Sequence, residues 1–470
     1  MKVYLINPPA AIKMSREGRC MVRGSAWAMI LPPFSLVSCA AVLRKNGFEV
    51  KVTDCIAEGI NLSALEGEIK KYNPDLVILN TTTPSIDEDL KVVEIAKKIS
   101  LKIKTGIIGI HPSSLPNKTF SLSKGLDYII RGEPEISTKD LALVLDNNQP
   151  LSKVKGISYR IAGEIFHNPP REFIKDLDSL PFPAWDLIDV NNYKIPFTNN
   201  PFLLILPSRG CPYQCIFCNA KVYYGEKSRL RSPQKIVKEM KLIKDKFKVE
   251  DFLFWTESFT LRKRFVMEIA DEILRRGLKF RWICSSRVDN VDLELLEKMK
   301  KAGCWMIGFG IESGDQKILN DSKKGITLEQ SINAVRLAKK VGMEISIHCI
   351  IGLPGETKKT ALKTLSFAKS LDADYAQFYC AVPFPGSELY KMAGEKKWLS
   401  TSDWSRFNQS QSVLNTETLK AEEVMQLRKK AYFNYYLRPK QIFGTLRKIR
   451  SVSELRSLFY LVKDFLGWIR

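Results

Sequence analysis

The sequence predicts an α/β protein in which a doubly wound parallel sheet is followed by a partial (β/α)6 barrel and a helical C-terminal tail. Short apolar runs alternate with amphipathic segments in the first part of the chain and again in the middle, as in parallel sheets covered by helices. The chain has 470 residues, enough for two or three domains. The predicted boundaries are 1–145 for the first domain, 146–195 for a connector, 196–386 for the barrel and 387–470 for the helical region.

The composition, 45% hydrophobic and 26% charged, is that of a folded protein in water. Met1–Pro9 reads as a short strand and loop, not as a signal peptide, and no apolar run is long enough to span a bilayer. Ten cysteines are too sparse for a disulfide framework, so we expect a cytoplasmic, reducing and anaerobic setting. The net charge of +22 indicates either attraction to polyanions or a lysine-rich surface that only solvates the fold.

In the first domain, the apolar periodicity predicts a regular alternation of strands and helices. The expected strands are Val3–Ile6, Glu49–Thr53, Leu76–Leu79, Thr105–Ile110 and Tyr128–Ile130, and the expected helices are Leu36–Asn46, Leu62–Tyr72 and Ile86–Ile99. Ligands of such sheets bind outside the carboxyl ends of the strands. The polar loops Thr81–Ser85, Gly109–Ser113 and Gly132–Glu135 fall there.

The connector contains an expected hairpin around Ala162-Gly163, and six strand–helix units follow it. The expected strands are Phe202–Leu206, Asp251–Trp255, Phe280–Ser285, Trp305–Ile311, Glu344–Ile350 and Tyr375–Tyr379, and the expected helices are Pro233–Phe247, Leu261–Arg276, Val291–Ala302, Leu328–Val341 and Thr357–Ser370. Six units predict a barrel that is open on one side, with its chemistry at the C-terminal ends of the strands.

Three cysteines after the first barrel strand carry the clearest chemical pattern. Cys211, Cys215 and Cys218 are spaced C-x3-C-x2-C, and three thiolates this close together can hold three irons of a cubic [4Fe–4S] cluster. The fourth iron then stays open to a small molecule. A structural zinc site is the first alternative, but it normally needs a fourth ligand nearby, and the next cysteine is Cys284. A chance grouping of core cysteines is the second.

This loop resembles the signature of the radical S-adenosylmethionine (SAM) superfamily, in which an aromatic residue precedes the last cysteine, as Phe217 does. The resemblance continues in the turn Gly352–Glu356 and in Val382–Ser387. It implies that the three cysteines ligate the cluster and that SAM chelates the open iron. It also implies reductive cleavage of SAM to a 5′-deoxyadenosyl radical, with an electron donor such as flavodoxin or ferredoxin.

Polar side chains stand at the ends of the later barrel strands, namely Glu257, Ser285, Arg287 and Glu312. We interpret them as SAM contacts, because Arg287 can pair with the carboxylate while Glu312 or Glu257 binds the ammonium or the ribose hydroxyls. Structural ion pairs are the alternative for these charged groups. His348 lies within a strand and is interpreted as a hydrogen-bonded core histidine.

The first domain resembles the flavodoxin-like cobalamin-binding domain found in front of many radical SAM domains. The matching segments are Asn7–Pro9, Pro32–Leu36, Gly109–Pro112 and Arg131–Glu135. The resemblance implies bound cobalamin. The expected contacts are Thr82, Thr83, Gly109, His111, Gly132 and Glu133.

The match to the cobalamin-binding domain has departures. Ile108-Gly109 stands where the family often has Gly-Gly, and Pro134 replaces a second glycine. The Asp-x-His-x-x-Gly motif that supplies a lower cobalt ligand in many B12 proteins is missing, so His111 is interpreted as a loop residue near the ligand. A flavodoxin-like domain that has lost its ligand is the alternative.

From Thr418 on, the chain reads as helical. The aromatic run Ala431–Pro439 resembles the tail of radical SAM proteins related to the anaerobic magnesium-protoporphyrin IX monomethyl ester cyclase and the lipid C-methylases. Residues 446–470 alternate basic and apolar side chains and either cap the open barrel or lie peripherally on the inner membrane surface. Both interpretations favour an apolar substrate such as a lipid, an isoprenoid or a tetrapyrrole.

These patterns leave three classes of function. The first is a cobalamin-dependent radical SAM methyltransferase that modifies an unactivated carbon of a small apolar molecule. The second is a radical SAM cyclase that forms a ring by oxidation. The third is an iron–sulfur electron carrier or sensor, although carriers usually ligate all four irons with cysteine. Nucleic acid is an unlikely substrate, because no RNA-binding module is appended.

Overall fold

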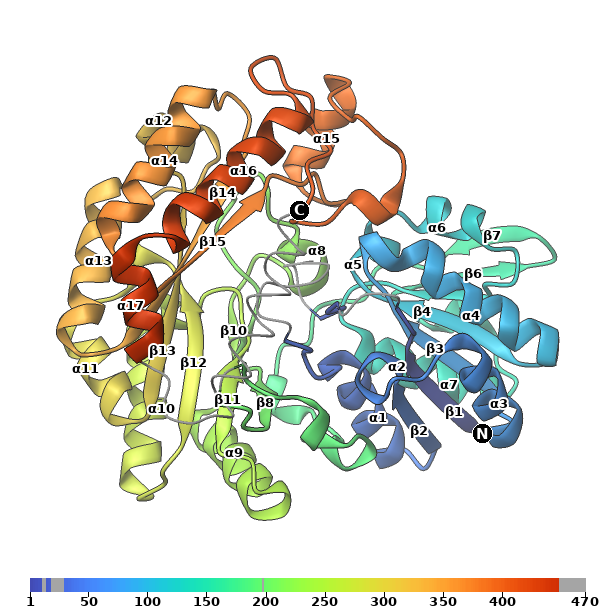
Figure 1. Ribbon diagram of the computed structural model, residues 1–470. Helices are drawn as coiled ribbons and strands as arrows, with labels where there is room; N and C mark the ends of the chain where they lie inside the picture. The colour runs from blue at the N-terminus through green and yellow to red at the C-terminus, as the bar shows by residue number, and fades with distance from the viewer. Residues whose placement is uncertain (11–13, 18–28, 197, 448–470) are drawn as a thin grey trace.

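The computed structural model describes residues 1–10, 14–17, 29–196 and 198–447, and it shows two α/β units that lie side by side (Figure 1). Both predicted sheets are present, and the prediction of a doubly wound domain followed by a partial barrel is confirmed. In the described part of the chain, no helix is long and apolar enough to cross a membrane. Apart from its first two positions, the basic and apolar segment 446–470 lies outside the described residues.

The first sheet has seven strands in the order β2-β1-β3-β4-β5-β6-β7. Its strands are β1 (Lys2–Asn7), β2 (Glu49–Asp54), β3 (Leu76–Asn80), β4 (Lys104–Ile108), β5 (Tyr128–Ile130), β6 (Ile157–Ile161) and β7 (Glu164–His167). The first five are parallel, and the predicted hairpin β6–β7 adds two antiparallel strands to one edge. Ala162 and Gly163 have φ angles of 50° and 89°, as a tight two-residue hairpin turn requires.

Helices cover both faces of this sheet. They are α1 (Phe34–Lys45), α2 (Cys55–Glu58), α3 (Leu62–Tyr72), α4 (Ile86–Ile99), α5 (Ile110–Ser114), α6 (Pro116–Leu122) and α7 (Pro134–Asp146). Alternate residues of β1 separate the two cores: Val3 and Leu5 pack with α1 and α7, whereas Tyr4 and Ile6 pack with α3 and α4. The expected strand to Ile110 ends at Ile108, because helix α5 begins at Ile110.

The second sheet has six parallel strands in sequence order. They are β8 (Phe202–Ile205), β11 (Asp251–Phe254), β12 (Arg281–Ser286), β13 (Cys304–Glu312), β14 (Glu344–Ile351) and β15 (Tyr375–Cys380). The edge strands β8 and β15 do not pair with each other, so the barrel is open on one side. Its inner face is turned toward the first domain (Figure 1).

Helices cover most of the outside of the barrel, whereas the short helix α8 (Ala220–Tyr224) lies between the two domains, next to α5 (Figure 1). The others are α9 (Pro233–Phe247), α10 (Lys263–Arg275), α11 (Leu293–Lys301), α12 (Gln316–Asp321), α13 (Leu328–Lys340), α14 (Lys358–Leu371), α15 (Glu388–Glu395), α16 (Ala421–Tyr436) and α17 (Pro439–Arg447). Side chains fix where the main ones begin: Ser232, Asp292, Thr327 and Thr357 each accept a hydrogen bond from the first turn of the helix that follows.

The aromatic run near the C-terminus covers the exposed edge of strand β15. The Tyr436 hydroxyl accepts from the Ala376 N–H (3.0 Å) and donates to the Ala376 carbonyl (2.8 Å). The Tyr432 hydroxyl accepts from the Phe378 N–H (3.0 Å), and Arg428 donates to the Phe378 carbonyl (2.9 Å). An edge strand presents unpaired backbone groups, and α16 satisfies four of them with side chains.

Candidate active site between the two domains

The cysteine loop begins in a short ribbon of β9 (Ser208–Arg209) paired with β10 (Arg229–Leu230). Gly210 follows with a φ of 91°, and a Cβ there would lie 2.3 Å from the Lys227 carbonyl oxygen, so only glycine fits. This turn delivers Cys211, whose N–H donates to the Gly225 carbonyl (3.2 Å).

The three predicted cluster ligands are half-buried, and none of them is in a disulfide. The Cys218 N–H donates to the Cys215 carbonyl (3.1 Å), and the Ile216 N–H donates to the Ser322 carbonyl (3.1 Å), which anchors the loop to the barrel. Burial raises the pKa of the Cys215 thiol to about 11, while the positive charge of Lys324 acts in the opposite direction.

The spacing of the cysteines suits a cluster better than a single ion. Within the described ranges, no three His, Cys, Asp or Glu side chains converge on a point that one metal ion could occupy. A cubic cluster does not require such convergence, because each cysteine binds a different iron. The half-buried loop, with three thiols on one short turn, therefore fits the predicted cluster.

Arg287 connects the end of β12 to the cysteine loop. Its guanidinium lies 3.5 Å from the ring centroid of Tyr213, inside the loop, and its Nε and Nη2 both donate to Asp289 at 2.9 Å. Its Nη1 is buried and has no hydrogen-bond partner among the described residues. A buried guanidinium nitrogen without a partner is costly, so this position fits a ligand carboxylate such as that of SAM.

Glu312 at the end of β13 is paired with Lys324, which the sequence analysis missed. The Lys324 Nζ lies 2.6 Å from Glu312 Oε1, and both residues are less than a tenth exposed. A Cβ on Gly310 would lie 2.5 Å from that oxygen and 2.8 Å from that nitrogen, so the glycine makes room for the pair. The structure thus gives Glu312 the ion pair that was the alternative to a SAM contact.

A cavity lies between the domains. On one side it is lined by the strand ends of the first sheet at Asn80, Thr81 and Gly109, and on the other by Glu257 and Ser285 of the barrel. Its empty space, including the part open to solvent, is about 810 Å³. Three residues that the sequence predicted as cofactor contacts line this cavity, namely Gly109, Glu257 and Ser285.

Gly109 lies in the first-domain wall of this cavity, at the end of β4. Gly109 has a φ of 135°, and a Cβ there would lie 2.2 Å from the Thr81 carbonyl oxygen. The ends of β3 and β4 therefore meet with no side chain between them, at the carboxyl edge where such sheets bind ligands. This edge, where Gly109 adds no side chain, is therefore where the predicted corrin of cobalamin would approach the sheet.

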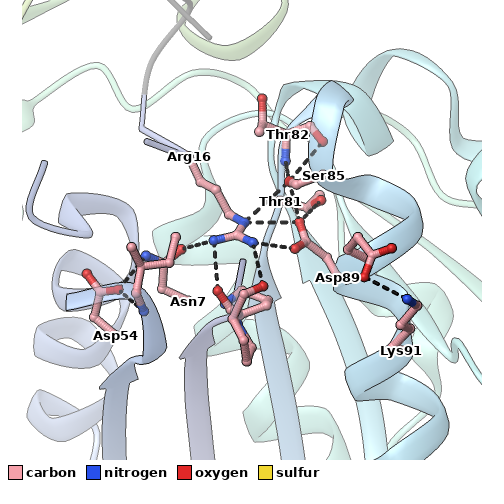
Figure 2. A network of polar contacts seen from close by, with 12 residues as sticks. Asn7, Arg16, Asp54, Thr81, Thr82, Ser85, Asp89 and Lys91 are labelled. Carbon is pink, nitrogen blue, oxygen red and sulfur yellow. Dashed lines mark hydrogen bonds and ion pairs between the residues drawn. The ribbon is translucent and has the colours of Figure 1, made fainter. Parts of the chain in front are cut away.

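Arg16, which the sequence analysis missed, lines the cavity. Its side chain lies in a network of polar contacts with Asn7, Thr81, Ser85 and Asp89 (Figure 2). Its guanidinium donates to Asp89 Oδ1 (2.6 Å) and Oδ2 (3.1 Å), to Asn7 Oδ1 (3.3 Å) and to the Pro8 carbonyl (2.9 Å). The hydroxyls of Thr81 and Ser85 also donate to Asp89 (2.6 Å each). The Arg16–Asp89 ion pair at the centre of this network is fully buried, and its hydrogen bonds hold both side chains in place.

Three other predicted cobalamin contacts, in the loops Thr81–Ser85 and Gly109–Ser113, are not among the residues that line the cavity. Thr82, Thr83 and His111 are fully buried. His111 Nδ1 is 3.3 Å from the Thr83 hydroxyl, and its ring packs edge-on against Trp404 at 4.8 Å. Burial lowers the pKa of His111 to about 3, so the ring is neutral and held by protein groups.

Glu133 has a different partner from the one expected. Its carboxylate pairs with Arg209 (3.1 Å) and Arg229 (2.9 Å) of the β9–β10 ribbon. It also accepts from the Ile174 N–H (2.7 Å). Glu133 therefore joins the two domains, and the neighbouring Gly132 donates its N–H to the Ser113 hydroxyl (3.0 Å). Gly132 and Glu133, which the sequence predicted as cobalamin contacts, therefore contact protein groups and are not among the residues that line the cavity.

A doubly wound domain and a barrel with three loop cysteines share one cavity, which defines the class of the protein. It is an enzyme that holds an iron–sulfur cluster and SAM in one domain and a corrin in the other. Residues 205–368 match the model of the radical SAM superfamily, and residues 23–142 match that of the B12 binding domain. The chain belongs to the radical SAM superfamily, among the members that carry a B12-binding domain. Its cofactors are the [4Fe–4S] cluster, SAM and cobalamin.

Curated relatives extend over most of the chain. An uncharacterised methyltransferase of Pyrococcus horikoshii is 34% identical over 94% of this chain and 93% of its own. The anaerobic magnesium-protoporphyrin IX monomethyl ester cyclase of Rubrivivax gelatinosus is 26% identical over 84% of this chain and 72% of its own. Cytidylyl-2-hydroxyethylphosphonate methyltransferase of Streptomyces wedmorensis is 26% identical over 91% of this chain and 88% of its own.

Solved structures have the same fold. The radical SAM methyltransferase TsrM from Kitasatospora setae, with cobalamin and a [4Fe–4S] cluster bound, has a TM-score of 0.73 and covers 99% of both chains at 16% identity. The cobalamin-dependent radical SAM enzyme OxsB, with aqua-cobalamin and SAM bound, has a TM-score of 0.77 and covers 100% of this chain and 71% of its own at 16% identity.

Proposed function

We propose that this protein is a cobalamin-dependent C-methyltransferase that acts on an unactivated carbon of an apolar molecule, such as a lipid, an isoprenoid or a tetrapyrrole. The cavity shared by the two domains carries the proposal, because the carboxyl edge of the first sheet faces Glu257 and Ser285 of the barrel across it. Apolar walls support the substrate class: Ile110, Tyr223 and Phe254 also line the cavity.

In this proposal the residues of the chain hold the cluster, orient SAM and enclose the reacting carbon. Cys211, Cys215 and Cys218 hold the cluster. Nη1 of Arg287, which no described residue bonds, takes the carboxylate of SAM. When bound, the cluster supplies the electron that splits SAM, and cobalamin carries a methyl group. The aromatic walls exclude water from the reacting carbon. We infer that a flavodoxin or ferredoxin delivers the electrons.

The proposed reaction consumes two SAM molecules. One loses its 5′-deoxyadenosyl part, which leaves with a hydrogen atom of the substrate as 5′-deoxyadenosine beside methionine. The other gives its methyl group to the substrate carbon and leaves as S-adenosylhomocysteine. The overall reaction is balanced by two electrons from the external donor. The names of two relatives, both methyltransferases, support this reaction.

A radical SAM cyclase is the second candidate, favoured by the relative from Rubrivivax gelatinosus. A cyclase needs the 5′-deoxyadenosine half of the chemistry but transfers no methyl group. The family assignment argues against an electron carrier or sensor, because its relatives are enzymes.

Co-products separate the two candidates. The holoenzyme, reconstituted without oxygen, is supplied with reductant, SAM labelled in its methyl group with deuterium, and a small-molecule extract of cells that carry the gene. A methyltransferase forms S-adenosylhomocysteine, 5′-deoxyadenosine and a product that carries the labelled methyl group. A cyclase forms 5′-deoxyadenosine and an unlabelled product that has lost hydrogen. Absence of 5′-deoxyadenosine would contradict both.

A further inference from the structure

The loop of residues 322–325, between α12 and α13, contacts the groups of the predicted cluster site at both of its ends. At one end the Ser322 carbonyl accepts from the N–H of Ile216 in the cysteine loop (3.1 Å). At the other end the Gly325 carbonyl accepts from Nη2 of Arg287 (3.2 Å), whose guanidinium stacks on the same cysteine loop. Lys324 lies between these two anchor points and therefore beside the cysteine loop.

Lys324 forms a buried ion pair with Glu312, at the end of β13. Its Nζ lies 2.6 Å from Glu312 Oε1, and neither side chain is more than a tenth exposed. Among the described residues the ammonium has no other hydrogen-bond partner, so two of its three N–H groups remain available to donate. Apolar side chains of similar volume are often at least as stable as a buried ion pair, so stability alone does not account for these charges.

The backbone is strained at the point where this ion pair forms. Glu312 has a φ of 62°, in the left-handed region that residues other than glycine rarely adopt. The register between β13 and β14 also shifts between Gly310 and Glu312. Strained residues of this kind cost free energy and gather at functional sites. A strained residue and a buried ion pair thus occur together, next to the cysteine loop.

The positive end of the ion pair acts on the cysteines more strongly than the negative end. Burial raises the pKa of the Cys215 thiol, the charge of Lys324 lowers it, and the weaker effect of Glu312 raises it. This agrees with the position of Lys324 on the loop that bonds the cysteine loop. Charge and hydrogen bonds to sulfur are two of the factors that set the reduction potential of an iron–sulfur cluster.

We propose that Lys324 raises the reduction potential of the cluster, with Glu312 as the positioning residue that holds its ammonium in place. In the reduction step a flavodoxin or ferredoxin loses one electron and the cluster gains it, and no bond forms or breaks. Lys324 stabilises the added negative charge through its own charge and through N–H groups that can donate to a sulfur. The inference rests on the predicted cluster and not on methyl transfer, so it applies equally to a methyltransferase and to a cyclase.

The test compares reduction potentials and needs no substrate. Lys324→Met, Glu312→Gln and the double variant are reconstituted with cluster and cobalamin and titrated with reductant, and the EPR signal of the reduced cluster gives each midpoint potential. Lys324→Met leaves the carboxylate of Glu312 without its cation. We therefore expect the equilibrium constant for reduction to fall about tenfold, which is about 59 mV for one electron.

The other two variants separate the two charges. Glu312→Gln removes the negative charge and keeps Lys324, so its midpoint potential should lie above that of wild type. The double variant removes both charges, so its midpoint should lie between those of Lys324→Met and wild type. If Lys324→Met does not take up iron, Glu312→Gln decides, because an unchanged midpoint in that variant would overturn the proposal.

Lys323→Met is the matched control, because it removes the same charge one residue away. Lys323 is exposed and pairs with Glu388 of α15 (2.7 Å), so the midpoint of this variant should be that of wild type. Equal midpoints in Lys324→Met and Lys323→Met would overturn the proposal.

SAM binding and product formation distinguish two other outcomes. If Lys324→Met raises the Kd for SAM in equilibrium dialysis while its midpoint is unchanged, Lys324 binds SAM and the proposal is wrong. If the midpoints are as expected but wild type forms 5′-deoxyadenosine without labelled product, the inference about Lys324 stands and methyl transfer is the part that is wrong.

Discussion

Arg209 Nη2 lies 2.5 Å from Glu135 Oε1, across the boundary between the two domains, and both side chains are almost completely buried. Arg209 stands two residues before Cys211, and Glu135 is in the first turn of α7. Burial raises the pKa of Glu135, but the charge of Arg209 and the hydrogen bonds that the carboxylate accepts together lower the pKa overall. The segment Arg131–Glu135, which resembles a cobalamin-binding loop, therefore also fixes the cysteine loop to the first domain.

Removal of Arg209 should be strongly destabilising. Arg209→Ala leaves the carboxylate of Glu135 buried without its cation, which costs about 3–5 kcal/mol in comparable pairs. Urea unfolding of the holoenzyme measures the loss. Arg44→Ala is the matched control, because the Arg44–Asp186 pair (2.7 Å) is more than a third exposed, and such pairs contribute up to about 1 kcal/mol. Equal losses in the two variants would contradict the prediction.

The strands and the loops of the first sheet were predictable from the sequence, but the ion pairs between distant segments were not. Hydrophobic alternation located the strands, and parallel-sheet geometry correctly placed the loops after β3 and β4 at the binding edge. Side-chain partners distant in sequence were not predictable: Arg16 meets Asp89 and Glu135 meets Arg209 only after folding. No local pattern marks these pairs, because each is made by segments more than 70 residues apart.

The side chains of α16 that cover the edge of β15 also meet partners that are distant in sequence. The aromatic run of α16 was recognised from its composition, but its hydroxyls bond the backbone of β15, which precedes it by more than 50 residues. The exposure of the His348 side chain, which is only half-buried, was not predictable for a similar reason. Its strand was predicted correctly, yet which face of β14 points inward is decided by pairing with β13 and β15.

Loss of one cluster ligand should abolish SAM cleavage without unfolding the barrel. Cys218→Ala removes one thiolate from a half-buried loop whose backbone bonds stay in place, so iron content and 5′-deoxyadenosine formation should both fall to background. Cys304→Ala is the control, because Cys304 is buried at the opposite end of the barrel, where β13 begins. Cleavage by Cys218→Ala at the wild-type rate would show that this thiolate is not a ligand.

Arg287→Lys should weaken SAM binding while it preserves the charge. Lysine cannot stack on Tyr213, hold Asp289 and still present a nitrogen where Nη1 lies, so we expect the Kd for SAM to rise about tenfold. Equilibrium dialysis of the reconstituted enzyme measures this change. Arg281→Lys, at the start of the same strand and half exposed, should bind SAM like wild type. An unchanged Kd in Arg287→Lys would argue that Nη1 meets another group.

The tyrosine hydroxyls on α16 should stabilise the barrel by protecting its edge. Tyr432→Phe leaves the Phe378 N–H buried without an acceptor, at a cost of about 1–3 kcal/mol, and the ring packing is retained. Thermal unfolding of the holoenzyme measures the effect. Tyr390→Phe is the comparison, because that hydroxyl meets the exposed Lys118 at 3.4 Å and should contribute little. If Tyr432→Phe unfolds at the wild-type temperature, the Phe378 N–H finds another hydrogen-bond acceptor.

Glu17 should make stability fall as the pH rises. It is completely buried beside the cavity, where it accepts from the Ser35 N–H (3.1 Å) and hydroxyl (2.9 Å) and from Asn80 (2.9 Å), and burial raises its pKa to about 7. The folded protein therefore holds a proton that the unfolded chain releases near its ordinary pKa of about 4.3. Stability contributed by that proton is complete below this value and is lost as the pH rises toward the folded pKa.

Glu17→Gln should flatten this pH dependence, because an amide resembles the protonated acid and the Ser35 hydroxyl can turn to accept from it. Urea unfolding midpoints at about pH 5 and about pH 8 measure how stability changes with pH. Other buried carboxyls also contribute to this change, such as Glu356, whose pKa burial raises to about 8. The difference between variant and wild type gives the contribution of Glu17 alone. Glu66→Gln, on the exposed face of α3, is the control and should keep the wild-type slope. A slope in Glu17→Gln as steep as that of wild type would mean that Glu17 is already ionised in the folded protein at pH 5.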